Sequence, residues 1–511
     1  ANMETLQRTA NRGSVSTGFN IDNSIMFTTQ GTYADSGSYF YDVIASSEGW
    51  AANSNAGTNA RKCTVSAWVK RTALTESSHY PRIFSYRAGG VAFDVFFDPS
   101  SDQLTMYDDN TSMSLKTNRS FRDTAAFYHI VVAVDQTQGT AANRVKVYVN
   151  GVQETSWATE DYGNQNVDLS AFRAAGTNVY VGGAANDASA YFNGYISEYN
   201  FIDGAQLAQT DFGEFDDDTG IWIPKTFTGS YGTLGHFYNF TVASDMGKDF
   251  SGNGNDCNNR GDGITNGAAR QATDTPTNNF CTLLGQQQAS VVGTEPSIKE
   301  GGTTMFGGVS GTQNAIGTMG VRNGKWYFES TITDSGGVGT ENHNFGVAST
   351  EEITTWSTGS GHDIGYISTG WACASNSAPR NNNATATNAN ATGALAVDKI
   401  MGVAIDMDNG KIWWHREGTW TSINSTVGNP ANGTAPAFSN LLTATTEHLI
   451  PAGGFYVNNG NQTRAMNFGG YALAVFTAVG TYTDANGYGS FAYQPPSGYY
   501  ALCTKNLAEY G

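Results

Sequence analysis

Hydrophobic and polar residues alternate with a period of two in many short stretches of this chain, and clusters of Gly, Asn, Asp and Ser separate most of these stretches. In RVKVYVNG, at residues 144–151, Val145, Val147 and Val149 fall on one face of a strand and the residues between them on the other. Long stretches with the 3.6-residue period of a helix are missing from the sequence. The pattern therefore predicts short antiparallel strands packed as sandwiches.

One hairpin pattern occurs twice, as HIVVAVDQTQGTAANRVKVYVNGVQ at 129–153 and as IMGVAIDMDNGKIWWHREGTW at 400–420. Each copy is an apolar alternating run that ends in Asp, then a polar turn, then a second run closed by Gly. The pairs Asn150-Gly151 and Glu417-Gly418 provide turn chemistry, since Gly accepts a positive φ. Two copies predict two domains of related architecture.

The chain of 511 residues is too long for one ordinary domain. We expect an N-terminal arm at 1–20, a first sandwich at 21–218, a connector at 219–304 and a second sandwich at 305–511. The connector contains DFSGNGNDCNNRGDG at 249–263, whose many turn-forming residues indicate an ordered but irregular segment.

Composition and charge exclude several classes of partner. The net charge is −18 and no basic stripe is present, so we expect no nucleic-acid binding. No apolar run reaches the length of a membrane span, and the first residues contain no apolar signal-peptide core, so we expect no membrane insertion. The cysteines form no CxxC pair and are predicted to be mostly buried thiols, with a Cys257–Cys281 pair left open: Cys63, Cys257, Cys281, Cys373 and Cys503.

Two parts of the chain resemble known families. Residues 24–215 resemble the laminin-G-like, concanavalin A-type jelly roll through TVSAWVKR, YHIVVAVDQ, VKVYVNGVQ, VYVGG and YFNGYISEYNFIDGAQL, where Gly194 and Glu198 stand in the closing strand of the family. Residues 305–507 resemble a SPRY domain through GKWYFESTI, NFGVAS, DIGYIS, IMGVAIDMDNGKIWWHREG, NFGG and PPSGYYAL. The resemblances imply an all-β chain of two concanavalin A-like jelly-roll β-sandwiches joined by the connector.

The connector resembles a segment of phage virion proteins of the tail-fibre or spike kind, through DFSGNGNDCNN and TDTPTNNF. This resemblance implies a protein of the virion surface that is assembled in the host cytoplasm, a setting that free cysteines fit. Its expected partners are other virion proteins, which the arm would contact, a host-surface glycan, and further copies of the chain in a homo-oligomer.

Many glucan hydrolases share the concanavalin A-type fold, and the resemblance implies that catalysis would need a Glu, an Asp two residues later and a further Glu. The stretch EFDDDTG begins in that way with Glu214 and Asp216, but Asp218 and Thr219 follow where the second Glu should stand. The stretch also lies beyond the last strand of its domain. We therefore expect no enzymatic activity.

Calcium is the only cofactor alternative, because laminin-G-like domains often hold it at the rim of the sandwich. Calcium needs several oxygen ligands from converging loops, and no compact DxDxDG loop is present. We interpret the candidate residues first as turn formers and keep Ca²⁺ as the alternative. The candidates are Asp94, Asp98, Asp135 and Asp187, and Asp249, Asn253, Asn255 and Asp256.

Sugars are recognised by exposed aromatic faces with polar side chains beside them. Loops of the second domain place three Trp residues near such side chains, and we predict a ligand site there, with core packing of each Trp as the alternative: Trp356, His362, Trp371, Arg380 and Trp420. The predicted function is a non-enzymatic bacteriophage surface protein that binds host polysaccharide through many weak contacts. The alternative is a structural capsid decoration or tail protein whose sandwiches contact neighbouring subunits.

Overall fold

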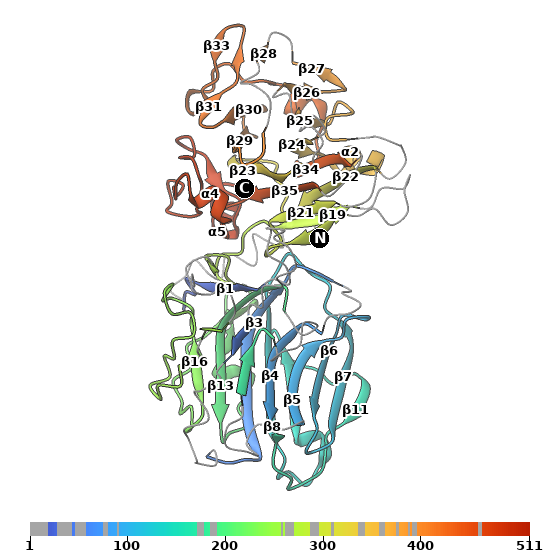
Figure 1. The fold of residues 1–511 in the computed structure, drawn as a ribbon, viewed down its shortest axis with the longest axis vertical. Coiled ribbons are helices and arrows are strands. Elements are labelled where there is room, and N and C mark those ends of the chain that lie inside the picture. Colours follow the sequence, from blue (N-terminus) through green and yellow to red (C-terminus); the bar gives the residue numbers. More distant parts are fainter. Residues whose placement is uncertain are drawn as a thin grey trace. The chain divides into compact units, whose positions relative to one another are not determined.

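The computed structural model describes most of the chain and divides it into two compact units (Figure 1). Residues 12–278 contain the first sandwich, and residues 279–511 contain the second. The described residues are 19–27, 43–45, 58–74, 80–88, 91–170, 178–183, 192–256, 259–260, 270–286, 296–307, 311–335, 343–356, 363–374, 378–386, 389–390, 396–457 and 462–511.

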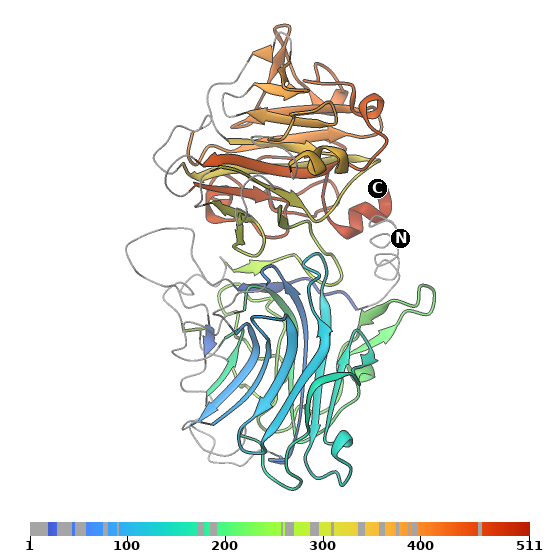
Figure 2. The same ribbon diagram turned by 90° about the vertical axis from the view of Figure 1, so that its right-hand side faces the viewer.

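The first sandwich is made of two antiparallel sheets of eight strands each (Figures 1 and 2). Sheet A has the order β10-β9-β8-β3-β13-β1-β18, and β16 also pairs with β13. Its strands are β1 (Ser24–Phe27), β3 (Lys62–Arg71), β8 (Tyr128–Asp135), β9 (Val145–Val149), β10 (Val152–Gln153), β13 (Gly194–Asp203), β16 (His236–Tyr238) and β18 (Gln271–Ala272).

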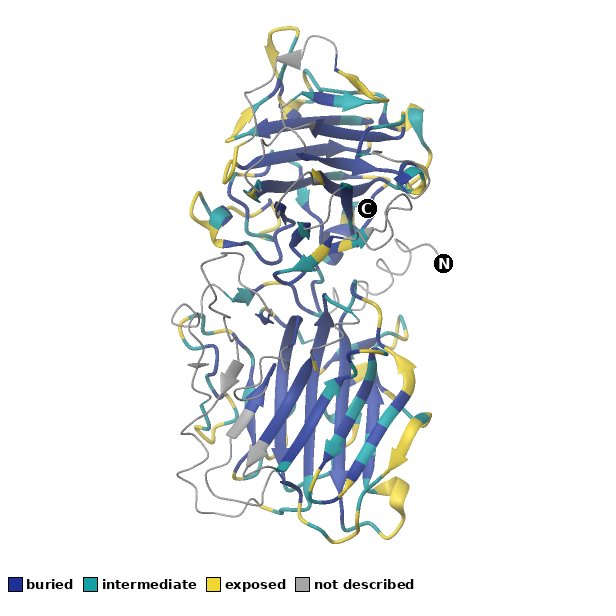
Figure 3. Ribbon diagram, turned by 45° about the vertical axis from the view of Figure 1, so that its right-hand side comes forward, coloured by how far each residue is buried: buried dark blue, intermediate teal, exposed yellow. Residues whose placement is uncertain are grey.

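Sheet B has the order β11-β7-β6-β5-β4-β12-β2-β17. Figure 3 shows buried and partly exposed residues alternating along its strands β6 and β7, while the edge strand β11 is mostly exposed. Its strands are β2 (Val43–Ala45), β4 (Arg82–Ala88), β5 (Val91–Phe97), β6 (Gln103–Asp108), β7 (Met113–Ser120), β11 (Trp157–Asp161), β12 (Asn178–Val181) and β17 (Asn259–Arg260).

The core of the first sandwich is built by alternate residues of both sheets. Val145, Val147 and Val149 belong to it, as their spacing predicts. Their partners across the ladder are Val134, Val132 and Ile130 of β8. Burying one such side chain contributes about 1.5–3 kcal/mol, so this ladder is a substantial part of what fixes the register of the sheet.

The predicted connector at 219–304 is wrong as a separate segment. Residues up to 278 belong to the first sandwich, to which they add β16, β17 and β18, and residues from 279 belong to the second. The hairpin β14 (Gly213–Phe215) and β15 (Trp222–Pro224) also lies in the first unit. These strands have two or three residues, too few for alternation to be visible among so many turn formers.

The second sandwich has a seven-stranded sheet, β19-β22-β34-β24-β25-β26-β27, and an eight-stranded sheet, β20-β21-β35-β23-β29-β30-β31, in which β36 pairs with β23 in parallel. A small third sheet has the order β28-β32-β33.

The strands of the second sandwich are β19 (Leu283–Gln286), β20 (Ser297–Lys299), β21 (Thr304–Gly307), β22 (Gly311–Gly317), β23 (Lys325–Asp334), β24 (His343–Ala348), β25 (Gly370–Ala374), β26 (Pro379–Asn381), β27 (Ala384–Thr385), β28 (Ala389–Asn390), β29 (Met401–Asp406), β30 (Lys411–Arg416), β31 (Thr419–Trp420), β32 (Ser422–Ile423), β33 (Thr426–Val427), β34 (Ile450–Val457), β35 (Gln462–Asn467) and β36 (Tyr500–Ala501).

Helices are short in the described residues. The α-helices are α2 (Thr350–Trp356), α3 (Leu441–Ala444), α4 (Ala474–Thr477) and α5 (Thr504–Tyr510), and 3₁₀ turns occur at Ala141–Asn143, Gln209–Asp211 and Pro430–Asn432. Across the part of the chain that the structure describes, none of these helices has the length and apolar character needed to cross a lipid bilayer. The predicted all-β class with two sandwiches is confirmed.

The repeated hairpin pattern is confirmed in both sandwiches. Strands β8 and β9 pair in the first, and β29 and β30 pair in the second. The predicted turns follow each copy: Asn150 and Gly151 have φ of 48° and 79°, and Glu417 and Gly418 have φ of 48° and 77°. Positive φ at both central residues is the geometry of a type I′ turn, which suits the twist of two-residue hairpins.

Candidate functional site: a crevice on the outer face of sheet A

Strand β13 contains a bulge that turns Glu198 toward the outer face of sheet A. The pairing of β13 with β3 shifts between Ser197 and Asn200, and Glu198 has a φ of +47°. A residue with a Cβ is strained in this region, and such bulges and strained residues concentrate at functional sites. The position of Glu198 is therefore the first reason to examine this face.

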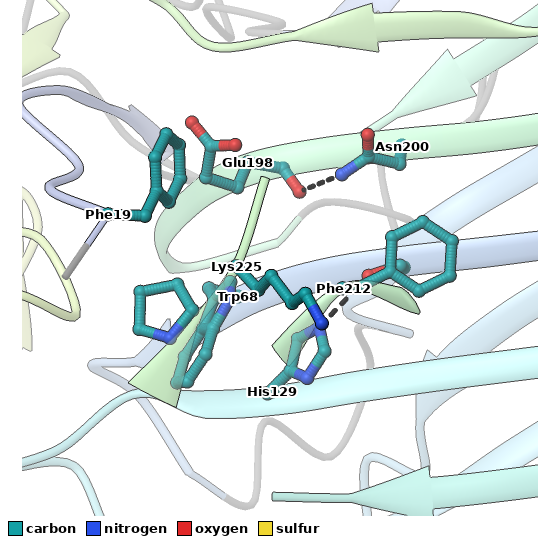
Figure 4. A pocket seen from close by; sticks show the side chains of 9 residues that line it. Phe19, Trp68, His129, Glu198, Asn200, Phe212 and Lys225 are labelled. Atoms are coloured by element: carbon teal, nitrogen blue, oxygen red, sulfur yellow. Dashed lines mark hydrogen bonds between the residues drawn. The ribbon is translucent and has the colours of Figure 1, made fainter. Parts of the chain in front are cut away.

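A crevice with an empty volume of about 180 Å³, part of it open to solvent, lies above the middle strands of sheet A (Figure 4). The strands β3, β8 and β13 form its floor, and residues 212–225 and Phe19 form its walls. Most of this volume is open solvent and narrow gaps between side chains, and no part of it is wide enough to enclose a water molecule, so a ligand could contact only the rim of the crevice. The lining residues are Phe19, Ser66, Trp68, His129, Glu198, Asn200, Phe212, Pro224 and Lys225.

Three aromatic rings are stacked beside the crevice. Trp68 lies on His129 with ring centroids 4.6 Å apart, and Trp222 lies 5.9 Å from His129 on an almost parallel plane. Gly151 and Gly213 make room for Trp222, because a Cβ at either position would lie within 2.4 Å of the indole ring. The small residues thus allow the hairpin β14–β15 to lie flat over the sheet.

Hydrogen bonds fix the tautomer of His129. The Nε1 group of Trp222 donates to Nδ1 of His129 at 2.9 Å, so the imidazole carries its proton on Nε2 and donates it to Oγ of Ser66, also at 2.9 Å. Burial lowers the pKa of His129 to about 3, which keeps the ring neutral. A serine nucleophile needs a His that accepts its proton, so this pair is arranged the wrong way for nucleophilic catalysis.

Glu198 is the unpaired carboxyl group of the crevice. Its side chain is 9% exposed, and no hydrogen bond or ion pair to its carboxyl oxygens occurs among the described residues. Burial, and to a smaller degree the charge of Asp22, raises the pKa of Glu198 to about 8. At neutral pH the group is therefore mostly a neutral acid that can both donate and accept a hydrogen bond.

Asn200 and Tyr231 hold the neighbouring polar groups in place. The Nδ2 group of Asn200 donates to the backbone oxygen of Glu198 at 3.0 Å, and the Tyr231 hydroxyl donates to Oδ1 of Asn200 at 3.0 Å. Burial, followed by the charge of Glu198, raises the pKa of Tyr231 and keeps its hydroxyl protonated. The crevice thus places a fixed amide and an unpaired acid beside aromatic rings that are largely buried against one another.

The sequence did not identify this site. Glu198 was noted only as a landmark of the closing strand, and Trp68, His129 and Lys225 were not singled out. The bulge that turns Glu198 outward leaves no sign in an alternating pattern. Trp222 stands out in the sequence as an aromatic residue among turn formers. Its hydrogen-bond partner His129 lies far away in the sequence, so the pair could not be recognised there.

The predicted sugar site of the second domain is largely wrong in its aromatic residues. Trp356 and Trp371 are both fully buried, so neither has a face on which a sugar could stack. Each fills the interior with a large apolar ring, and Trp371 also donates from Nε1 to Oδ1 of Asn440 at 3.0 Å. Core packing, the alternative reading for these two, is the correct one.

The remaining predicted residues of that site do not form one shelf. His362 lies outside the described residues. Arg380 forms an ion pair with Asp363 and donates from Nη2 to the backbone oxygen of Ile364 at 2.8 Å, so its guanidinium is occupied locally. Trp420 is half-buried and lies edge-on to His415, with ring centroids 4.8 Å apart. Of the predicted set, Trp420 remains a prediction as a ligand contact.

The candidate calcium ligands are occupied by protein groups. Asp94 accepts from Arg82 at 3.2 Å, and Asp135 accepts from Thr137 at 2.6 Å. Burial alone would raise the pKa of Asp98, but hydrogen bonds from Lys116 and Ser100 outweigh this effect and hold the pKa below its usual value. Asp187 lies outside the described residues. No group of three or more His, Cys, Asp or Glu side chains in the described ranges could hold a metal ion.

The second calcium set organises a loop. Asp249 accepts backbone N–H groups of Phe237, Ser251 and Asn255 at 2.8–2.9 Å. Asn253 and Asp256 add bonds within the same loop. The turn-forming interpretation is therefore supported for these residues.

The hydrolase-like stretch is a hairpin turn. Asp216 accepts the backbone N–H and the hydroxyl of Thr219 at 2.8 and 2.7 Å, and Glu214 pairs with Lys225 at 3.4 Å on the surface.

Four cysteines are free and buried, including Cys281, whereas Cys257 lies outside the described residues.

Comparison with known proteins assigns a superfamily likeness to the first sandwich. Residues 14–210 match the family model described as the concanavalin A-like lectin/glucanases superfamily. No curated protein sequence matches the chain.

Three solved structures are among those that are similar to parts of this chain. The SPRY domain of human HERC1 is 16% identical over 34% of this chain and 91% of that chain, with a TM-score of 0.25. A SAP-like pentraxin from Limulus polyphemus is 14% identical over 37% and 80%, with a TM-score of 0.26. Domain 4 of AbnA, a GH43 extracellular arabinanase from Geobacillus stearothermophilus in complex with arabinotriose, is 20% identical over 29% and 63%, with a TM-score of 0.21. These values identify neither a ligand nor a partner for this chain. The likeness to concanavalin A-like lectins and glucanases therefore concerns residues 14–210 alone.

Proposed function

We propose that this chain is a non-enzymatic, glycan-binding protein of a bacteriophage surface, and that the rim of the crevice at Glu198 contacts one sugar unit of a host polysaccharide. The observation that carries the proposal is a buried, unpaired carboxyl group that faces an aromatic-lined crevice. The match of residues 14–210 to a lectin and glucanase superfamily supports it.

The groups that line the crevice favour binding over hydrolysis. Cleavage of a glycosidic bond needs two carboxyl groups, one as acid and one as base or nucleophile. Glu198 is the one carboxyl group among the lining residues. The Ser66–His129 pair cannot replace the second, because His129 already donates to Ser66.

Display on a particle explains how such a small site could be useful. A rim that contacts one sugar unit binds weakly, but many copies on one particle raise the effective concentration of sites. The resemblance of the segment at 249–280 to phage virion proteins and the four buried free thiols support this setting.

A structural role in subunit contacts is the second candidate, and an exposed apolar patch favours it. Val152 is 62% exposed on β10, the edge strand of sheet A, and Phe215 is 49% exposed next to Trp222, with ring centroids 4.9 Å apart. Because Gly151 also packs on Trp222, the two exposed side chains belong to one region. Edge strands with apolar side chains readily pair with another chain.

A glycan array with the full chain and three variants tests the proposal. Glu198→Ala is expected to lower binding at least tenfold, whereas Glu154→Ala, a half-buried carboxyl control away from the crevice, and Trp420→Ala are expected to leave it unchanged. Alanine keeps the Cβ at the strained position, so the bulge is not relieved. Loss of binding in Trp420→Ala alone would move the site to the second sandwich, and no binding to any glycan would favour the structural role. Imaging of the intact particle tests the location separately.

A further inference from the structure

Arg464 is a fully buried arginine in the second sandwich. It projects from β35 into the space between the two sheets, where its Cζ lies 5.4 Å from the centre of the Phe345 ring. Nη1 donates to Oγ of Ser330 at 2.7 Å. Nε and Nη2 have no hydrogen-bond partner in the part of the chain that the structure describes.

The first sandwich shows how this protein otherwise accommodates a buried arginine. Arg71 is equally buried and lies over the Phe97 ring at 4.5 Å. However, its Nη2 forms an ion pair with Asp102 at 2.9 Å, and its Nη1 donates to the backbone oxygen of Phe121 at 2.7 Å. Arg464 has the aromatic platform and one hydroxyl, but no carboxylate.

The neighbours of Arg464 do not supply the missing negative charge. Burial, and then the charge of Arg464, lowers the pKa of His343 to about 2, so the imidazole is neutral, and neither of its ring nitrogens has a partner in the described ranges. Burial raises the pKa of the Cys373 thiol despite the nearby guanidinium, so the sulfur is neutral as well. Burial lowers the pKa of Arg464 only to about 9, which leaves the side chain charged at neutral pH.

The two free donors of Arg464 converge. Nε–H and Nη2–H point outward from the same edge of the planar guanidinium, which is the edge that grips a single acceptor with two bonds. His343 adds one N–H, since a neutral imidazole always carries one proton. A charge buried without a counter-ion costs several kcal/mol, so a fold that buries this guanidinium needs an acceptor at its free edge.

We infer that the Nε and Nη2 groups of Arg464, with the imidazole of His343, bind a small inorganic anion of chloride size between the sheets of the second sandwich. The anion would provide the charge that Asp102 provides for Arg71 in the first sandwich. This inference is independent of the proposed glycan site.

Bromide, a heavier substitute for chloride, tests the inference on the full chain. At constant ionic strength maintained with gluconate, Tm is expected to rise with the logarithm of the bromide concentration above its Kd, by about 3–6 °C for each tenfold increase. Arg464→Met is expected to abolish that rise. Arg122→Met, which alters a 60% exposed arginine, is expected to retain it.

Crystals grown in bromide give a second readout that does not depend on the folding of a variant. An anomalous peak in contact with Nε and Nη2 of Arg464 is expected. Water density without an anomalous signal at that position would overturn the inference. A thermal response that Arg464→Met keeps in full would do the same, because it would then come from the general effect of the salt.

Discussion

The hydroxyl of Tyr327 lies 2.7 Å from Nε2 of His415 and 2.9 Å from Oε1 of Glu329, deep in the second sandwich. Because the backbone N–H of Gly418 donates to Nδ1 of His415, the imidazole proton is on Nε2 and points to the tyrosine oxygen. The tyrosine then donates to the carboxylate, so the three groups form one directed chain.

Tyr327→Phe is expected to destabilise the protein by about 1–3 kcal/mol, because it removes one buried hydrogen bond from Glu329 and leaves the Nε2–H of His415 without its acceptor. Urea denaturation followed by tryptophan fluorescence measures the change. Tyr482→Phe, at a tyrosine that is 45% exposed, is the matched control and should stay within about 0.5 kcal/mol of the parent. Equal effects of the two variants would contradict the directed chain.

Trp222→Phe tests the hydrogen bond that determines the tautomer of His129. Phenylalanine keeps most of the stacking but leaves Nδ1 of His129 without its donor, which we expect to cost about 1–3 kcal/mol in the first sandwich. Trp157→Phe changes a half-buried indole of the same sandwich and serves as the control. An unchanged stability of Trp222→Phe would show that the bond is not formed in solution.

The acid at Glu198 predicts a pH dependence of stability with a definite sign. Its pKa is raised from 4.5 to about 8, by burial first and then by Asp22. Between these values the folded state holds a proton that the unfolded state has released. The free energy of unfolding therefore falls as the pH rises, by up to about 1.4 kcal/mol per pH unit. This stabilising contribution of Glu198 is complete below pH 4.5 and is lost above about pH 8.

Glu198→Gln keeps the shape of the side chain and removes its titration. The stability of the parent relative to this variant is expected to decrease from about pH 5 to about pH 8 and then level off. Urea denaturation of both proteins over this range measures the difference. A difference that does not change with pH would show that the carboxyl group is solvated or paired in solution.

The alternating pattern predicted both sandwiches because it depends on local geometry. Val145, Val147 and Val149 face the core as predicted, and the turns at Asn150-Gly151 and Glu417-Gly418 have the positive φ values that their residues favour. In each case the alternating pattern or the turn pair lies within a few consecutive residues, so the sequence alone predicts it.

The candidate site could not be predicted because it depends on contacts between distant segments. A bulge turns Glu198 outward, and the tautomer of His129 is set by a hydrogen bond from Trp222, which lies far along the chain. The error at Trp356 has a related cause. This residue ends the short helix α2, which looks like loop in the sequence, yet the helix brings the ring into the interior.

Trp356→Ala tests this correction, since the two interpretations of Trp356 predict opposite results. If the ring is core, as its complete burial indicates, the substitution costs about 3–5 kcal/mol and leaves glycan binding by the folded protein unchanged. Trp420→Ala removes a half-buried ring at the edge strand β31, so we expect less than half of that cost. Thermal denaturation gives the first comparison, and the glycan array at a temperature where both variants are folded gives the second. A stable Trp356→Ala protein that no longer binds glycan would instead support the predicted sugar site of the second domain, with Trp356 as one of its contacts. The predicted result is the reverse, because a ring enclosed by Ile364, Ala372 and Ala452 has no surface left to offer a sugar.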